Sequence, residues 1–260
     1  MELILIGAVA LLTSGLTLFS GFGLGTILMP VFALFFPVSL AIATTAVVHF
    51  ANNIFKFGLL AKQADWQVVV RFGVPAAIAA IVGASLLNLF DKMPPLAHYT
   101  LGESTFEITV VKAVVGLLLV AFSLLELWPR FQALAFPSRW LPLGGALSGF
   151  FGGLSGNQGA LRSAFLIKAG LSKEAFVATG VVAAVIVDAS RLIVYGTDIA
   201  ADHLAQSQKL IAPVVVGTLC AFIGSFVGRQ ALRKVTLQAV QIIVALAMLL
   251  IGVGLASGLI

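Results

Sequence analysis

Charged residues are scarce in this 260-residue chain. They make up 10% of it, against roughly 25% in a typical soluble domain. Hydrophobic residues make up 60%, and the mean hydropathy is +1.13. No polar stretch between the long apolar runs is large enough to fold as a separate soluble domain. The composition therefore predicts one all-α integral membrane protein, with residues 1–260 forming a single membrane domain.

Several other features are missing, and each absence narrows the function. The only cysteine, Cys220, lies in an apolar run, so we expect a small packed side chain and no disulfide or thiol pair. No GxxxxGK[ST] loop is present, so ATP is not expected to drive the protein directly. The net charge of +5 is not gathered on a basic aromatic face, so no nucleic acid partner is expected. The potential spans contain no cluster of metal ligands, and neither a metal nor a cofactor is expected.

Apolar segments occur from one end of the chain to the other. Eight candidate spans lie near residues 3–19, 41–61, 67–90, 108–127, 140–154, 172–196, 209–228 and 237–258. Two further apolar pieces, near 24–36 and 158–169, follow glycine-rich breaks and are shorter than the roughly 20 residues of a spanning helix. They are predicted to be half-helices or re-entrant arms. Glu2 stands where a signal peptide would carry basic residues, so the first segment is interpreted as a span.

The two halves of the chain resemble each other. The stretch SGFGLGTILMP, which begins at Ser20, corresponds to SGNQGALRSAF, which begins at Ser155. We therefore predict two repeats, 1–128 and 138–260, joined by a short cytoplasmic linker. If each short arm returns the chain to its starting side, each repeat has five segments. An odd number inverts the second copy relative to the first.

The basic residues favour this inverted arrangement. It places most loop cations on one face, which the positive-inside rule makes cytoplasmic, with both termini periplasmic or extracellular. The cations on that face are Lys62, Arg130, Arg139, Lys168, Lys173, Arg229, Arg233 and Lys234, which leaves mainly Lys92 and Lys209 on the other. Eight simple crossings would divide the basic loops between the two faces.

The two glycine-rich breaks are the candidate binding site. Each precedes a short helix whose first backbone N–H groups and positive dipole end suit a small anion. Arg162 adds a positive charge about one turn into the second arm. The candidate substrate ligands are Ser20, Gly21, Gly23, Gly25, Ser155, Gly156, Asn157, Gln158, Gly159 and Arg162.

Polar residues within the spans are candidates for a pathway or for coupling, because such groups are costly in a membrane. They are Thr44, His49, Asn52, Asn53, Lys56, Thr179, Asp188 and Arg191. Asp188 is a candidate for proton coupling, and His49 could titrate near neutral pH. The alternatives are that Arg162, Lys56 and Arg191 snorkel to the membrane surface, and that the threonines cap or bridge helices. Glycines such as Gly15, Gly145 and Gly149 could serve close helix packing instead of a site.

The paired pattern resembles a known family. SGFGLGTILMPVFAL is followed by Phe36-Pro37 and AIATT, and it recurs more loosely as SGFFGGLSGNQGALRSAFLIKAGLSKEAFVATG. This pattern is similar to the sulfite exporter TauE/SafE family, and the similarity covers nearly the whole chain. The resemblance implies a permease for sulfite, thiosulfate or an organosulfonate in the bacterial inner membrane. Members are often richer in glycine where this chain has Asn157 and Gln158, so the particular anion stays open.

The predicted function is therefore secondary transport of a small sulfur-containing anion by alternating access, within membrane lipid and without enzymatic activity. Export could run on the membrane potential, whereas uptake would need a coupled proton or sodium ion. A permease for another anion, such as a carboxylate, is the first alternative. A remote alternative is an intramembrane serine protease, because residues 153–156 match a GxSG motif. The sequence offers Ser155 no histidine base in a later span.

Overall fold

The computed structural model describes residues 1–16, 24–132, 134–202, 204–231 and 237–260. The first half contains α1 (Glu2–Leu16), α2 (Leu24–Ala33), α3 (Val38–Leu60), α4 (Trp66–Asp91) and α5 (Val110–Leu127). The second contains α7 (Leu141–Ser155), α8 (Gly159–Leu166), α9 (Lys173–Asp202), α10 (Leu204–Ala231) and α11 (Leu237–Ala256). Short helices α6 (Pro129–Gln132), η1 (Ala61–Gln63) and η2 (Ser138–Trp140) lie in the connections. Each predicted segment thus corresponds to a helix, and the all-α class is confirmed.

Not every helix is long enough to cross a membrane by itself. Among the described residues, five helices have the length and apolar character of a span: α3 with η1, α4, α5, α9 and α10. The helices α1 and α7 have 15 residues each, about five short of a full span. The helix α7 ends because Gly156 adopts a left-handed conformation with φ of 83°, which favours glycine. The glycine-rich break therefore ends α7 before it reaches the length of a spanning helix.

The short helix α8 folds back along α7. The Ser148 hydroxyl on α7 donates a hydrogen bond to the Gln158 carbonyl just before α8, at 2.9 Å. Farther along, Phe165 near the end of α8 packs against Gly144 near the start of α7. The pair therefore forms a hairpin of two helices. In the first half, α2 likewise packs against α1.

Backbone-to-backbone packing joins α7 to α4. Three glycines of α7 lie directly against main-chain carbonyls of α4, with no room for a side chain. The pairs are Gly145 with Phe72, Gly149 with Ala76, and Gly153 with Ala80. Small residues permit such close approach between membrane helices. The packing interpretation therefore holds for Gly145 and Gly149.

This packing gives a stability prediction. Alanine at Gly149 would place its Cβ against the Ala76 carbonyl, so Gly149→Ala should destabilise the protein by about 1–3 kcal/mol. Gly58→Ala is the matched control, because a Cβ at Gly58 would meet nothing within 4 Å. Alanine there should be neutral or stabilising by up to ~1 kcal/mol. Thermal unfolding midpoints in detergent micelles would test this pair, and equal midpoints would contradict it.

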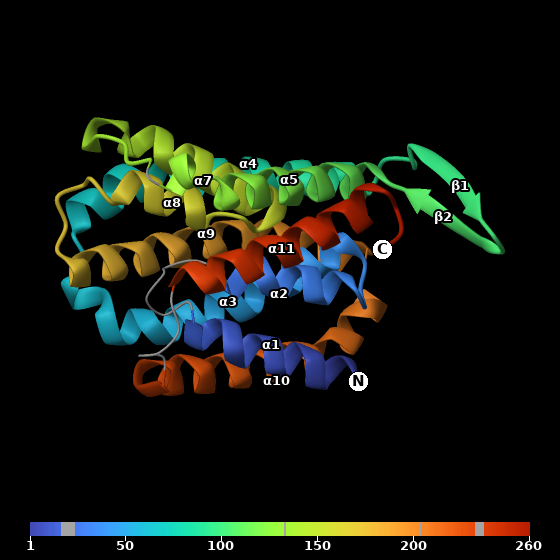
Figure 1. The fold of residues 1–260 in the computed structure, drawn as a ribbon, viewed down its shortest axis with the longest axis horizontal. Helices are drawn as coiled ribbons and strands as arrows, with labels where there is room; N and C mark the ends of the chain where they lie inside the picture. The colour runs from blue at the N-terminus through green and yellow to red at the C-terminus, as the bar shows by residue number, and fades with distance from the viewer. Residues whose placement is uncertain (17–23, 133, 203, 232–236) are drawn as a thin grey trace.

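Both chain termini lie at one end of the molecule, which also carries a projecting β-hairpin (Figure 1). The hairpin pairs β1 (Ala97–Leu101) with β2 (Ser104–Ile108), and Tyr99 stacks on Phe106 at 5.5 Å between ring centres. It was not among the sequence predictions. The connections from α3 to α4, from α5 to α7 and from α8 to α9 lie at the opposite end (Figure 1).

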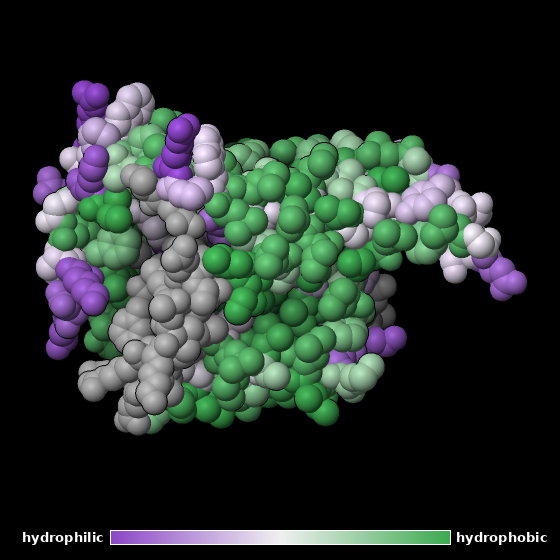
Figure 2. Space-filling view, viewed as in Figure 1, coloured by the Kyte–Doolittle hydropathy of each residue, from purple (hydrophilic) through white to green (hydrophobic). Residues whose placement is uncertain are grey.

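The outer surface between the two ends is apolar. Figure 2 shows a broad hydrophobic band along the helices, with hydrophilic residues gathered at the end opposite the hairpin and at the hairpin tip. Large aliphatic side chains such as Ile78 of α4 and Leu250 of α11 are 62% and 74% exposed. Exposed apolar area on this scale is suited to lipid rather than to water.

Candidate functional site

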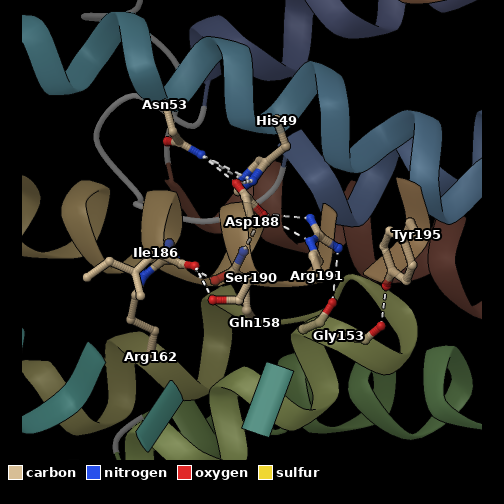
Figure 3. A network of polar contacts seen from close by, with 11 residues as sticks. His49, Asn53, Gly153, Gln158, Arg162, Ile186, Asp188, Ser190, Arg191 and Tyr195 are labelled. Atoms are coloured by element: carbon tan, nitrogen blue, oxygen red, sulfur yellow. Dashed lines mark hydrogen bonds and ion pairs between the residues drawn. The ribbon is translucent and has the colours of Figure 1, made fainter. Parts of the chain in front are cut away.

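A buried carboxylate, Asp188, lies midway along α9 and is held by side chains from α3, from α9 itself and from the turn before α8 (Figure 3). Its Oδ1 accepts hydrogen bonds from Arg191 Nη2 at 2.7 Å and Nε at 3.1 Å. The same oxygen accepts from Gln158 Nε2, which precedes α8, at 3.1 Å. Asp188 and Arg191 are both fully buried. A buried carboxylate needs such partners, because an unpaired charge in this position would be very costly.

The other oxygen of Asp188 faces α3 of the first half. His49 Nδ1 lies 2.6 Å from Asp188 Oδ2, and the Asn53 amide donates to the same oxygen at 3.5 Å. His49 and Asn53 are one helical turn apart, so both reach Asp188 from one face of α3. The carboxylate therefore links the two halves of the chain at a buried point.

Two further contacts tie α9 to the end of α7. Arg191 Nη1 donates to the Gly152 carbonyl at 3.0 Å, and the Tyr195 hydroxyl donates to the Gly153 carbonyl. Arg191 therefore lies in the core and does not snorkel to the membrane surface.

Tyr195 was not among the residues predicted from the sequence. A signal was present, since Tyr195 is one of two tyrosines and follows Asp188 by seven residues, which places both on one helix face.

Arg162 is also buried, at 4% exposure, and it lies beside Gly180 of α9. Its Nη1 donates to Gln158 Oε1 at 3.3 Å, so Gln158 connects Arg162 to Asp188. Lys56 on α3 is 7% exposed, and the like charges of Lys56 and Arg162 are close enough to act on each other. Neither cation reaches the surface along lipid, so the snorkelling alternative fails for both.

Asn157 occupies the turn between α7 and α8 with an unusual environment. It is 5% exposed, yet neither its amide nitrogen nor its amide oxygen has a hydrogen-bond partner among the described residues. Buried polar groups are nearly always paired, and an exception calls for a ligand or water. The next residues begin α8, and the side chain of its N-cap residue Gln158 makes no capping hydrogen bond.

The first turn of α2 approaches the second break. A Cβ built on Gly25 in the first turn of α2 would lie 3.5 Å from the His49 ring and 3.7 Å from the Gly156 carbonyl. The structure thus brings Gly25, His49 and Gly156 together. Ser20, Gly21 and Gly23 lie outside the described residues.

Other predicted site residues lie elsewhere. Asn52 Oδ1 accepts from Ser225 of α10 at 2.9 Å and from Ser14 of α1 at 3.4 Å, away from Asp188. Thr179 accepts from the Asp65 N–H at 3.0 Å and so bridges α9 to the start of α4. Thr44 is buried in α3, and Gly159 is the first residue of α8.

The protease alternative gains no support from Ser155. Its hydroxyl donates to the Phe151 carbonyl of its own helix at 3.0 Å. His49, the histidine nearest the breaks in the described chain, is bonded to Asp188 instead. Within the same described residues, no group of three His, Cys, Asp or Glu side chains could hold a metal ion.

An apolar helical bundle with broken helices around a buried charged network is typical of a membrane transport protein. The model of the family described as "Sulfite exporter TauE/SafE" matches residues 3–255. The chain therefore belongs to the sulfite exporter TauE/SafE family of membrane permeases, as the sequence resemblance predicted. Neither the curated proteins nor the solved structures gave a match.

Proposed function

We propose that this protein is a secondary transporter that carries a small sulfur-containing anion, such as sulfite, thiosulfate or an organosulfonate, by alternating access. The observation that carries the proposal is the buried, unpartnered amide of Asn157 at the start of α8, with Arg162 one turn further on. The amide nitrogen, the free N–H groups of a helix start and a guanidinium are all suited to an oxyanion.

The charge balance around the breaks supports an anion rather than a cation. The network contains one carboxylate, Asp188, and the cations Arg162, Arg191 and Lys56, all less than a tenth exposed. An excess of buried positive charge favours a negatively charged ligand, which lowers the electrostatic cost of the site. A carboxylate ion would satisfy the same chemistry and is the second candidate. The family favours sulfur anions.

The packing supports inverted repeats. In a duplicated chain, α1 of the first repeat corresponds to α7 of the second, and α4 corresponds to α10. The contact between α1 and α10 then corresponds to the contact between α7 and α4, and both contacts occur. The contacts α3–α9 and α5–α11 each map onto themselves. In addition, α1 begins at the end that holds both termini, whereas α7 begins at the opposite end (Figure 1). This pattern is that of two copies related by a two-fold axis in the membrane plane.

We infer that the end with both termini is periplasmic or extracellular. The connections at the other end carry Lys62, Arg130, Arg139 and Lys168, as the positive-inside rule expects of a cytoplasmic face. In this orientation the linker between the repeats, 1–128 and 138–260, is cytoplasmic. The membrane is the bacterial inner membrane, and the protein acts as a permease rather than as an enzyme.

The test is flux of labelled sulfite, thiosulfate and methanesulfonate into proteoliposomes. The intact protein should carry at least one of these anions selectively over acetate. Selective acetate transport would favour the carboxylate alternative. Absence of flux for every anion would overturn the proposal.

Asn157→Leu gives a sharper prediction, because leucine fills a similar volume and cannot hydrogen-bond. Transport should fall by at least about tenfold, since an anion would lose one partner, worth ~1.4 kcal/mol or more. Stability should stay equal or rise by up to about 1–3 kcal/mol, because an unsatisfied buried amide is removed.

Asn88→Leu is the matched control. The Asn88 amide donates to the Val194 carbonyl at 3.4 Å, far from the breaks in sequence. Loss of this hydrogen bond in Asn88→Leu should lower the unfolding midpoint and leave transport unchanged. Asn157→Leu should instead lower transport and leave the unfolding midpoint equal or higher. Unchanged transport in Asn157→Leu would remove this amide from the site.

A further inference from the structure

The contact between His49 and Asp188 fixes which nitrogen of the histidine can accept a proton. Asp188 Oδ1 already accepts from Arg191 and Gln158, so the carboxylate is surrounded by donors and remains ionised. At 2.6 Å from Oδ2, His49 Nδ1 must donate its hydrogen to Asp188. The neutral ring therefore presents Nε2 as its basic atom.

The Cγ–Cδ2 edge of the ring, next to Nε2, faces the first turn of α2, where the Gly156 carbonyl also lies close to Gly25. Ring carbon Cδ2, bonded to Nε2, is the atom nearest to a Cβ on Gly25, at 3.5 Å. The Asn53 amide nitrogen lies 3.3 Å from Nε2 and can donate to it while the ring is neutral. His49 thus lies between a fixed carboxylate and the place where the anion is proposed to bind.

The surrounding charges link the proton to the anion. The charged groups that act on His49 are Asp188 and Arg191 of α9 and Arg162 of α8. Lys56, on the same helix as His49, acts on Arg162, and α2 presents the uncharged Gly25. Without ligand the three groups that act on His49 have a formal excess of one positive charge, so a second buried positive charge on His49 adds to an electrostatic cost. An anion beside the ring relieves that cost, and by linkage each ligand raises the affinity for the other by the same factor.

We propose that His49 is the coupling site for a proton that moves in the same direction as the anion. This coupling rests on the proposed function. His49 Nε2 takes a proton from water when an anion binds beside Asn157 and the start of α8. It returns the proton to water when the anion leaves on the other side of the membrane. The anion and its proton together carry one negative charge fewer across the membrane than the anion alone. For a monovalent anion this removes the work against the membrane potential, about 2.3 kcal/mol per charge per 100 mV. Asp188 keeps its charge throughout and holds the imidazole in one tautomer.

The experiment follows proton and anion together. Proteoliposomes with a pH dye inside receive thiosulfate or methanesulfonate, which hold no titratable proton near neutral pH, so a co-transported proton must be carried by the protein. The expected result is internal acidification of one proton per anion. Anion entry should also be faster when the outside is acidic.

His49→Asn separates coupling from folding. The asparagine amide can occupy the place of Nδ1 and keep the contact with Asp188, but it cannot carry a proton. Proton entry per anion should fall at least about tenfold, while the unfolding midpoint stays near that of the intact protein. His98→Asn, at an exposed histidine of the hairpin, is the matched control and should keep full coupling.

Three results would overturn the proposal: anion entry without acidification, acidification unchanged in His49→Asn, or transport of sulfite alone, in which case the substrate can bring its own proton. The first and second leave the proposed function intact, because anion flux persists. No flux of any anion would remove the proposed function and this coupling site together.

Discussion

Replacing Asp188 with leucine should cost the protein about 3–5 kcal/mol of folding stability, the largest loss we expect from a single substitution in the network. Arg191 would keep a buried guanidinium without its carboxylate, and His49 and Gln158 would each lose a buried hydrogen-bond partner. The measurement is the midpoint of unfolding in detergent, by heat or by a denaturing detergent. A loss below about 1 kcal/mol would contradict the network as a stabilising link between α3 and α9.

The double variant Asp188→Leu/Arg191→Met distinguishes an unpaired charge from lost packing. Removing both members of a buried ion pair is far less costly than removing one, because no isolated charge remains. The double variant should therefore be more stable than Asp188→Leu alone, with a coupling energy of about 0.5–3 kcal/mol between the two positions. Additive losses would show that the two side chains act independently. Neither variant is expected to transport, because the histidine and Gln158 lose their anchor.

Arg162→Gln should reduce anion transport by roughly 30-fold or more, equivalent to about 2 kcal/mol or more for a buried charged contact. Glutamine can still form a hydrogen bond with Gln158. A reduction in transport would therefore be caused by the missing positive charge and not by the loss of that hydrogen bond. The guanidinium is 4% exposed and lies beside Gly180, so water cannot replace it easily. Initial rates over a range of anion concentrations would separate weaker binding from slower turnover.

Lys168→Gln is the control for this charge effect. Lys168 is exposed just beyond α8, and its loss removes the same unit of charge from the same short segment. Its transport should match the intact protein within about twofold, since an exposed charge is screened by solvent. Equal transport in Arg162→Gln and Lys168→Gln would exclude Arg162 from the anion path.

The sequence was informative wherever the physics is local. Apolar runs placed the spans, and glycines next to polar residues placed the helix breaks, because both features act on neighbouring residues. Gly156 illustrates this: its positive φ ends α7 where the pattern predicted a break. The β-hairpin was not predicted from the sequence. Its pairing and the stacking of Tyr99 on Phe106 form only when the strands meet.

Duplication gave the sequence one long-range clue. The offset of 135 residues that aligns Ser20 with Ser155 also aligns Asn53 with Asp188, but two aligned residues need not be in contact. Only the crossing of α3 and α9 places the Asn53 amide and the Asp188 carboxylate together. The same offset aligned Lys56 with Arg191, and both are buried instead of reaching the membrane surface.

The sequence by itself therefore determined that this is an apolar helical membrane protein of the TauE/SafE family, with two broken segments and a few costly polar groups within its spans. Helix periodicity and hydropathy are properties of adjacent residues, so they can be read without the fold. The tertiary structure decided which polar groups share a network. It joined His49 and Asp188, separated Asn52 from them, and left the buried Asn157 amide with no hydrogen-bond partner in the described part of the chain. Those outcomes depend on how helices distant in sequence pack against each other, and no local pattern encodes that packing.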